Sequence, residues 1–411
     1  MIDLSEMEQV ITAKLKLHLN KEQKQSLLET LAAFNNSMNH LLQVNYNDKS
    51  TSVKTIHKNY YHQIRNEFNL PSQLACAATR AVSNIYKTLW TRFKSQKDKA
   101  VLNKIPHYNQ LTANYTLNRD ITIKLENMEC SITTIDGRLK NVKLTGWNQH
   151  YKQIKQGKLC DPKITYDKRT KIFYLLLPVS LEIQEQKPKQ IVGIDAGQRT
   201  TLTCVSTTNE IKIYNISEAI RERKAKLSKQ RGTLMSKGTR PSRRKLLALK
   251  GRERRLISDV SHCISKSVVS DFQGSKLIME DLTNIRSNTK TYRKDKEQRR
   301  QVEQWNFAEM QFKMCYKSIL YNGIESIKVN PAYTSQKCPV CLSISSKNRV
   351  NGSKEFKCIN CGHEEDADIV GSRNILSTGL LVNQPNGSLS VNVRESLRIP
   401  GTSSHAKAWS Y

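Results

Sequence analysis

Long apolar runs are missing from this chain of 411 residues, and acidic residues are scarce in it. No stretch approaches the roughly 18 consecutive apolar residues of a spanning helix, so the sequence predicts no membrane-spanning segment. Residues 1–9 are polar and acidic, which predicts that no secretory signal is present. Apolar residues make up only 37% of the chain, a lean but globular share that argues against disorder throughout.

The shortage of acids leaves a large positive charge. Lys and Arg total 67 against 36 Asp and Glu, which gives a formal charge of +31. A surface this basic repels itself unless it meets a polyanion, either nucleic acid or an anionic membrane face. No basic amphipathic stretch with a broad apolar face stands out, so we expect a nucleic-acid partner and no membrane. Charge alone carries no sequence specificity.

The ten cysteines do not have the pattern of a disulfide framework, which indicates a reducing compartment. Six are scattered singly, and four form the pairs Cys338-Pro-Val-Cys341 and Cys358-Ile-Asn-Cys361, separated by 16 residues. Two such pairs at this spacing are typical of a zinc ribbon. Four protein ligands leave no open position, so the zinc should be structural. His363 is a possible substitute ligand, although we expect it to be solvated.

The first half of the chain changes its hydrophobic period twice. Residues 11–19 alternate between apolar and polar side chains and predict a half-buried strand. Asn20 and Gln23 then form the signature of a helix start, and residues 21–98 read as a block of three helices. From about 100 to 186 the period returns to two. The economical arrangement has the first strand join this later sheet, with the helical block inserted between them.

The second half follows a linker at 184–190 and mixes strands with long helices. We expect an antiparallel meander of three strands, then a basic helical region at 217–270, with 15 Lys or Arg between 221 and 255. The further predicted strands are a buried one at 276–281 and a short one at 327–329. A lid-like basic segment is expected at 286–303. Two more helices are expected, one at 367–378 and one marked by Trp305, Ala308, Phe312, Tyr316 and Ile319. The tail after Gly379 reads as disordered.

Three acids lie where strands end or a helix begins. Asp195 belongs to an otherwise apolar strand, Glu280 ends a second one, and Asp368 begins the helix after the cysteine pairs. Each alone is compatible with a structural charge. In an RNase-H-like fold, however, these three positions converge, and converging carboxylates are what two-metal phosphodiester hydrolysis requires.

The same segments resemble the TnpB family of transposon-associated nucleases. The matching segments are Gly193-Ile-Asp-Ala-Gly197 and Ile278-Met-Glu-Asp-Leu282 for the first two RuvC motifs, Asn330–Cys341 with Cys358-Ile-Asn-Cys-Gly362 for the zinc ribbon, and Ala367–Ile375 for the third motif. Order and spacing agree. In the third motif Val370, Gly371 and Ser372 stand where the family commonly has Asn, Ala and Ala. The match is specific over 188–378 and looser over 11–186.

The resemblance implies a multidomain α/β architecture. A helical recognition lobe is inserted in a wedge-type β-barrel, and an RNase-H-like RuvC nuclease carries an inserted zinc ribbon. The implied parts are 1–20 (first barrel strand), 21–98 (recognition lobe), 99–186 (rest of the barrel), 188–329 (nuclease with motifs one and two), 330–366 (zinc ribbon binding target nucleic acid), 367–378 (third motif) and 379–411 (disordered tail).

It also implies an RNA-guided DNA endonuclease that cuts double-stranded DNA beside a short transposon-adjacent motif. Asp195, Glu280 and Asp368 would be the catalytic residues and would hold two Mg²⁺ ions, while the four cysteines hold Zn²⁺. The guide RNA would derive from the transposon end. We expect a monomer in the prokaryotic cytoplasm, associated with the nucleoid.

Several alternatives remain open at this point. A miniature type V CRISPR effector would have the same chemistry with a different guide source. An RNA-guided DNA-binding protein with weak or no nuclease activity is a second alternative, although the intact acids argue against it. An unguided RuvC-like resolvase or a transposase does not need the large N-terminal block, and a zinc-ribbon RNA-binding scaffold leaves the three acids unexplained.

Overall fold

The computed structural model describes residues 6–96, 102–197, 202–216, 218–282, 307–349 and 354–382. The chain divides into two compact units, the N-terminal unit (Glu8–Glu182) and the C-terminal unit (Ile183–Tyr411 with Met1–Met7). The predicted lid at 286–303 and the tail beyond Val382 lie outside the described residues. Within the described ranges, no helix has the length and apolar character needed to cross a membrane.

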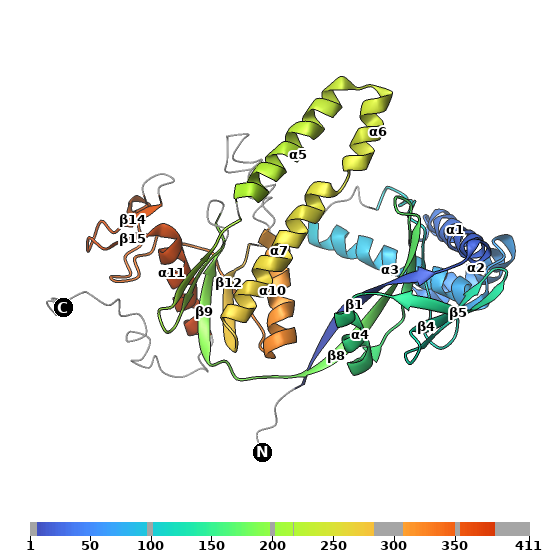
Figure 1. Ribbon diagram of the computed structural model, residues 1–411, viewed down its shortest axis with the longest axis horizontal. Coiled ribbons are helices and arrows are strands. Elements are labelled where there is room, and N and C mark those ends of the chain that lie inside the picture. The colour runs from blue at the N-terminus through green and yellow to red at the C-terminus, as the bar shows by residue number, and fades with distance from the viewer. Residues whose placement is uncertain are drawn as a thin grey trace, which may run out of the picture. The chain divides into compact units, whose positions relative to one another are not determined.

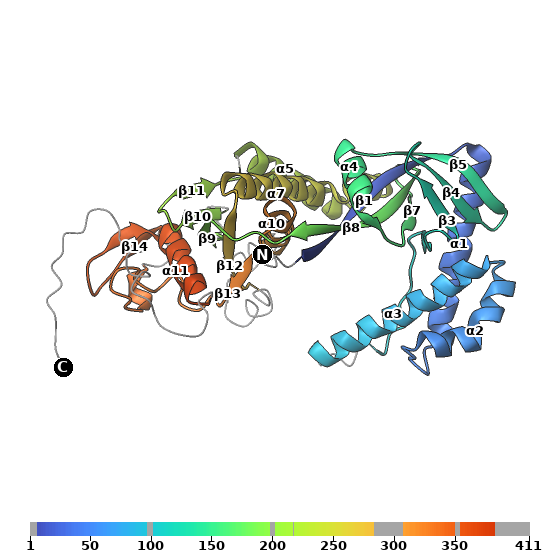
Figure 2. The same ribbon diagram turned by 90° about the horizontal axis from the view of Figure 1, so that it is seen from below.

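Three helices form the helical part of the N-terminal unit, as predicted. They are α1 (Lys21–Val44), α2 (Val53–Glu67) and α3 (Ser72–Gln96), and α3 packs against both of the others (Figure 2). The predicted start of α1 is confirmed, because the Asn20 side chain accepts a hydrogen bond from the Gln23 amide and the Gln23 side chain accepts one from the Asn20 amide.

Eight strands and one short helix complete the N-terminal unit. They are β1 (Glu6–His18), β2 (Thr112–Asn114), β3 (Ile121–Lys124), β4 (Glu129–Thr134), β5 (Gly137–Thr145), α4 (Asn148–Gln156), β6 (Lys158–Leu159), β7 (Lys163–Asp167) and β8 (Ile172–Gln184). Their order is β2-β7-β8-β1-β5-β4-β3, with β6 beside β8. The first strand therefore joins the later sheet across the helical insertion, as predicted. Among the described residues the sheet is a curled half-barrel whose two edge strands do not pair.

A five-stranded sheet forms the centre of the C-terminal unit. Its strands are β9 (Gln190–Asp195), β10 (Leu202–Ser206), β11 (Ile211–Tyr214), β12 (Ser275–Glu280) and β13 (Ile327–Val329), in the order β11-β10-β9-β12-β13. The first three form the predicted antiparallel meander. β12 lies parallel to both β9 and β13. This mixed order agrees with the RNase-H-like arrangement expected from the sequence.

Helices cover both faces of this sheet (Figure 2). One face packs against α7 (Arg252–Asp271) and α10 (Phe307–Asn322), with Val192 and Ile194 of β9 in that core. The other face carries α11 (Ala367–Val382). Side chains alternate along a strand, so Gly193 and Asp195 belong to the α11 face.

The predicted basic helical region at 217–270 consists of three helices. α5 (Glu218–Lys237) and α6 (Arg240–Leu249) form a hairpin that precedes α7 (Figure 1). No residue of α5 is buried, and Ser242 is the one buried residue of α6. The lysines and arginines of this hairpin therefore face solvent.

Two predicted helices differ from the structure in detail. The helix α10 exists, but its apolar residue Phe312 is 68% exposed. The buried side of α10 instead carries Met310, Met314 and two lysines, Lys313 and Lys317, whose ammonium groups donate to backbone and hydroxyl oxygens of α7. The helix α11 continues to Val382, so the first residues of the predicted disordered tail are helical.

Candidate functional site

The strands β9 and β12 deliver two of the predicted acids to one place. Their parallel pairing ends with Ile194 opposite Met279, and the next residue of each strand is Asp195 and Glu280. Both acids therefore stand at the same end of two hydrogen-bonded neighbouring strands. Both also lie on the face that α11 covers, since Gly193 of β9 and Ile278 of β12 contact α11.

The start of α11 brings the third acid. The Asp366 side chain accepts hydrogen bonds from the amides of Asp368 and Ile369, at 2.8 and 3.4 Å, which fixes the first turn of the helix. Gly371, one turn later, faces the Asp195 carboxylate, and a Cβ atom at this position would lie 2.9 Å from Asp195 Oδ2. The first turn of α11 thus lies directly against the end of β9.

The pKa of Asp195 reflects both its burial and the charges of the neighbouring residues. Burial raises the pKa of its carboxyl group to about 8, and the nearby charges of Glu280 and Asp368 act in the same direction. Arg349 acts in the opposite direction. Burial also raises the pKa of Glu280, against a hydrogen bond from Thr334 that lowers it. The structure therefore brings the three predicted acids together, each of them half-buried.

Mutual repulsion of carboxylates is what bound cations relieve, so the donor set suits hard metal ions. The acids are nevertheless spread more widely than the cysteines. Among the described residues, the four cysteines are the one group of three or more His, Cys, Asp or Glu residues whose ligand atoms all lie within 4.8 Å of one another.

Sequence reasoning missed two polar neighbours of the acids. Arg349 lies between the cysteine pairs, and its Nη2 is 3.9 Å from Asp368 Oδ1. The Thr334 hydroxyl, located between β13 and the first cysteine pair, lies 2.5 Å from Glu280 Oε1. A single Arg or Thr in a loop carries no periodic signal. Only the folding of the ribbon shows where these residues go.

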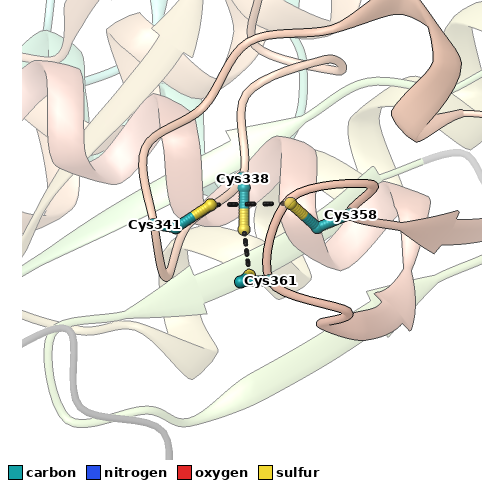
Figure 3. Close-up of side chains that lie close together, drawn as sticks. All are labelled: Cys338, Cys341, Cys358 and Cys361. Atoms are coloured by element: carbon teal, nitrogen blue, oxygen red, sulfur yellow. Dashed lines mark hydrogen bonds between the residues drawn. The ribbon is translucent and has the colours of Figure 1, made fainter. Parts of the chain in front are cut away.

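The four cysteines converge as their spacing predicted (Figure 3). The Sγ atoms of Cys338 and Cys361 are 3.6 Å apart, and those of Cys341 and Cys358 are 3.5 Å apart. Ligands at about 2.3 Å from a tetrahedral zinc lie about 3.8 Å from one another, so these separations fit a zinc centre and are far too long for disulfides. The cluster is suited to zinc.

The ribbon around the cysteines is built from short elements. They are a 3₁₀ turn, η2 (Ser346–Asn348), and the paired strands β14 (Glu355–Lys357) and β15 (Glu364–Asp366). His363 is outside the four-ligand group. It is not solvated as expected, because its side chain is 11% exposed and Nε2 lies 3.4 Å from Glu365 Oε2. Glu365 in turn pairs with Arg373 of α11.

Comparison with known proteins gives one family-model match and several similar sequences. The family model described as "Cas12f1-like, TNB domain" matches residues 307–375. TnpB-like protein MJ0751 of Methanocaldococcus jannaschii is 32% identical over 213 residues, which cover 49% of this chain and 73% of that protein. The putative RNA-guided DNA endonuclease InsQ of Escherichia coli is 26% identical over 246 residues, 57% of this chain and 60% of that protein.

A solved structure shares the fold. The cryo-EM structure of a Cas12f1–sgRNA–target DNA complex superimposes with a TM-score of 0.56 at 16% sequence identity, covering 85% of this chain and 82% of that one. This likeness concerns the fold alone.

Proposed function

This chain belongs to the TnpB-like family, and on that premise we propose that it is an RNA-guided DNA endonuclease. The observation that carries the proposal is the convergence of Asp195, Glu280 and Asp368 at the end of β9, with the pKa of Asp195 raised to about 8. A half-buried cluster of like charges costs folding free energy, and such clusters are characteristic of functional sites. The name of one relative, the putative RNA-guided DNA endonuclease InsQ, indicates the same activity.

The three acids are the proposed ligands of two Mg²⁺ ions. When bound, such ions activate water and stabilise the leaving 3′ oxygen. Asp195 and Glu280 are held rigidly because they end two strands of one sheet, and Asp368 is held by the first turn of α11. Arg349 offers a guanidinium beside Asp368, where it balances carboxylate charge and can contact a phosphate.

Zinc in the cysteine cluster would be structural. It would join two loops that share only a small hydrophobic core. That core consists of Cys338, Phe356, Cys358 and two residues of α11. The ribbon supplies Thr334 and Arg349 to the acid cluster, so its fold is a precondition for the site.

Guide RNA and double-stranded target DNA are the proposed partners. The solvent-facing hairpin α5–α6 and the N-terminal part of α7 concentrate positive charge, and phosphates are the ligands that such charge attracts. We assign this hairpin to phosphate contacts. The guide would come from a transposon end, and the protein itself would read only a short motif beside the target. The corresponding location is the prokaryotic cytoplasm at the nucleoid, with one copy of the chain per guide.

The direct test of the site is the variant Asp195→Asn in the protein copurified with its RNA. We expect cleavage of a matched DNA target in Mg²⁺ to fall by about 10³-fold or more, the scale seen when a member of a catalytic unit is removed. RNA content and target binding should remain. Glu325→Gln, an exposed acid of the same unit, is the matched control and should cleave normally.

Each other outcome has a definite meaning. Cleavage by Asp195→Asn at the wild-type rate contradicts the assignment of Asp195. A wild-type complex that binds its target and never cuts it, at any Mg²⁺ concentration, is an RNA-guided DNA-binding protein. An RNA whose variable segment matches a CRISPR array, and not a transposon flank, identifies a miniature type V effector.

A further inference from the structure

The loop between β13 and the first cysteine pair touches one of the proposed metal ligands. Thr334 is 7% exposed, and its Oγ1 lies 2.5 Å from Glu280 Oε1 and 3.1 Å from the backbone oxygen of Pro331. A hydroxyl group has one proton to donate. The carboxylate is the closer and the charged acceptor, so the proton belongs in the bond to Glu280.

Glu280 is also held through its backbone. Its carbonyl oxygen accepts a hydrogen bond of 2.8 Å from the Gln311 side-chain amide on α10. Thr334 engages one lone pair of Oε1, which leaves Oε2 and the second lone pair of Oε1 to bind a ligand. The Thr334 hydroxyl thus restrains the orientation of the carboxylate before any ligand arrives.

Thr334 is fixed in turn by α11. The Asn374 side-chain amide donates to the backbone oxygens of Thr334 and Lys337, at 2.7 and 2.8 Å, and Asn374 is 3% exposed. Lys337 directly precedes Cys338, the first cysteine of the cluster. A continuous chain of contacts therefore runs from the cysteine cluster through Asn374 and Thr334 to the Glu280 carboxylate.

We infer that Thr334 is a positioning residue that orients the Glu280 carboxylate toward its metal ion, and that Asn374 holds Thr334 in place. The inference rests on the proposed function, because it assumes that Glu280 binds a metal. It adds a role for the ribbon: this loop completes the ligand geometry of the nuclease site as well as folding around zinc. Neighbours that orient a metal ligand are typically worth 10- to 100-fold in metal affinity.

The test compares Thr334→Val, which keeps the shape and removes the hydroxyl, with Thr334→Ser, which keeps the hydroxyl. Thr378→Val is the matched control. Its hydroxyl lies on α11 and donates to the backbone oxygen of Asn374, with no bond to Glu280. Each variant is purified with its RNA, and its zinc content and melting temperature are measured first.

Two readouts follow. Mn²⁺ binding to the complex with an uncleavable target is measured by electron paramagnetic resonance, and cleavage is measured as a function of Mn²⁺ to separate half-saturation from maximal rate. We expect Thr334→Val to weaken Mn²⁺ binding about 10-fold or more, as for other neighbours that orient metal ligands. Thr334→Ser and Thr378→Val should bind Mn²⁺ like the wild type, and all three should keep their zinc.

Three results would overturn the inference. They are unchanged Mn²⁺ binding in Thr334→Val, equal impairment of Thr334→Ser and Thr334→Val, or loss of zinc and melting temperature in Thr334→Val, which would make Thr334 a folding residue of the ribbon. Failure of the proposed function is distinguishable, because a wild-type complex that never cleaves still reports Mn²⁺ binding, whose dependence on the Thr334 hydroxyl remains measurable.

Discussion

Asp195 is the residue whose position is hardest to attribute to folding alone. It ends a strand in which the three residues directly before it are buried, and Glu280 and Asp368 add negative charge beside it. A neutral side chain would fold here at lower cost. A bound ligand would offset this folding cost of the carboxylate. Functional sites commonly lower the stability of the unliganded protein in this way.

This cost predicts a pH dependence of stability. The pKa of Asp195 is about 8 in the folded protein and about 4 in an unfolded chain. Between these values the folded protein holds a proton that the unfolded chain releases, so the stability contribution present at low pH is lost as the pH rises toward 8. Asp195→Asn removes this loss.

The measurement is the free energy of unfolding by urea at pH 6 and pH 8, without added Mg²⁺ and without a chelator that would strip zinc. From pH 6 to pH 8 the wild type should lose about 2 kcal/mol more than Asp195→Asn, given about 1.4 kcal/mol per pH unit for one proton. Parallel losses in the two proteins would show that Asp195 titrates normally.

The structure shows what surrounds Val370, Gly371 and Ser372, the three residues of the third motif that depart from the common family pattern. Gly371 leaves the space that the Asp195 carboxylate occupies. Ser372 is fully buried, and its hydroxyl lies 2.9 Å from the backbone oxygens of both Thr203 and Asp368. Val370 is fully buried in the small core shared with the cysteine ribbon. Each residue fits its place, so the departures leave the acid cluster intact.

At the scale of elements, the packing of α11 on β9 sets the site. A Cβ atom at Gly193 would lie 2.6 Å from the Leu376 amide nitrogen and in still closer contact with the Ser372 carbonyl oxygen. Both are backbone atoms that cannot turn aside. The absence of a side chain at Gly193 is what allows the helix, and with it Asp368, to approach the strand.

Gly193→Ala should therefore lower the free energy of unfolding of the C-terminal unit by about 1–3 kcal/mol, the usual cost of overpacking. Gly232→Ala on α5 is the matched control. Apart from its chain neighbours and the backbone of its own helix, no described atom lies within 4 Å of the position that its new Cβ would occupy. The same change should stabilise by about 0.4–1 kcal/mol. Chemical denaturation measures both. Equal effects of the two substitutions would refute the close approach of α11.

The strands and caps were predictable because their signals are local. The alternation at 11–19, the Asn20 cap and the two cysteine pairs each specify their structure over a few residues. The buried face of α10 was not predictable, because two lysines reach oxygens of α7 there while Phe312 faces outward. Pairing of lysines with distant carbonyl groups leaves no trace in hydrophobic periodicity.

The residues of the candidate site also fall into those that the sequence predicted and those that only the structure revealed. The three acids were predicted as converging residues from strand ends and a helix start, which are positions that a sheet order brings together. Thr334 and Arg349 came only from the structure, since both belong to irregular loops of the ribbon. The boundaries proposed for the domains and the catalytic roles of the acids remain predictions.

At the scale of the whole molecule, charge is the dominant property. A net charge of +31 on 411 residues is shared between two units, and the exposed hairpin α5–α6, with 11 Lys or Arg against 2 Glu, carries +9 of it. Electrostatic binding of this kind recognises any polyanion. A specific activity therefore requires a second source of specificity, and for an RNA-guided endonuclease that source is the guide RNA.

The most direct test of guidance is to sequence the RNA that copurifies with the protein expressed from its native locus. We expect one discrete species that ends in a segment copied from DNA beside the gene, and a target matching that segment should be cut in Mg²⁺. A mixture of unrelated RNAs would contradict guidance, and the acid cluster would then belong to an unguided nuclease.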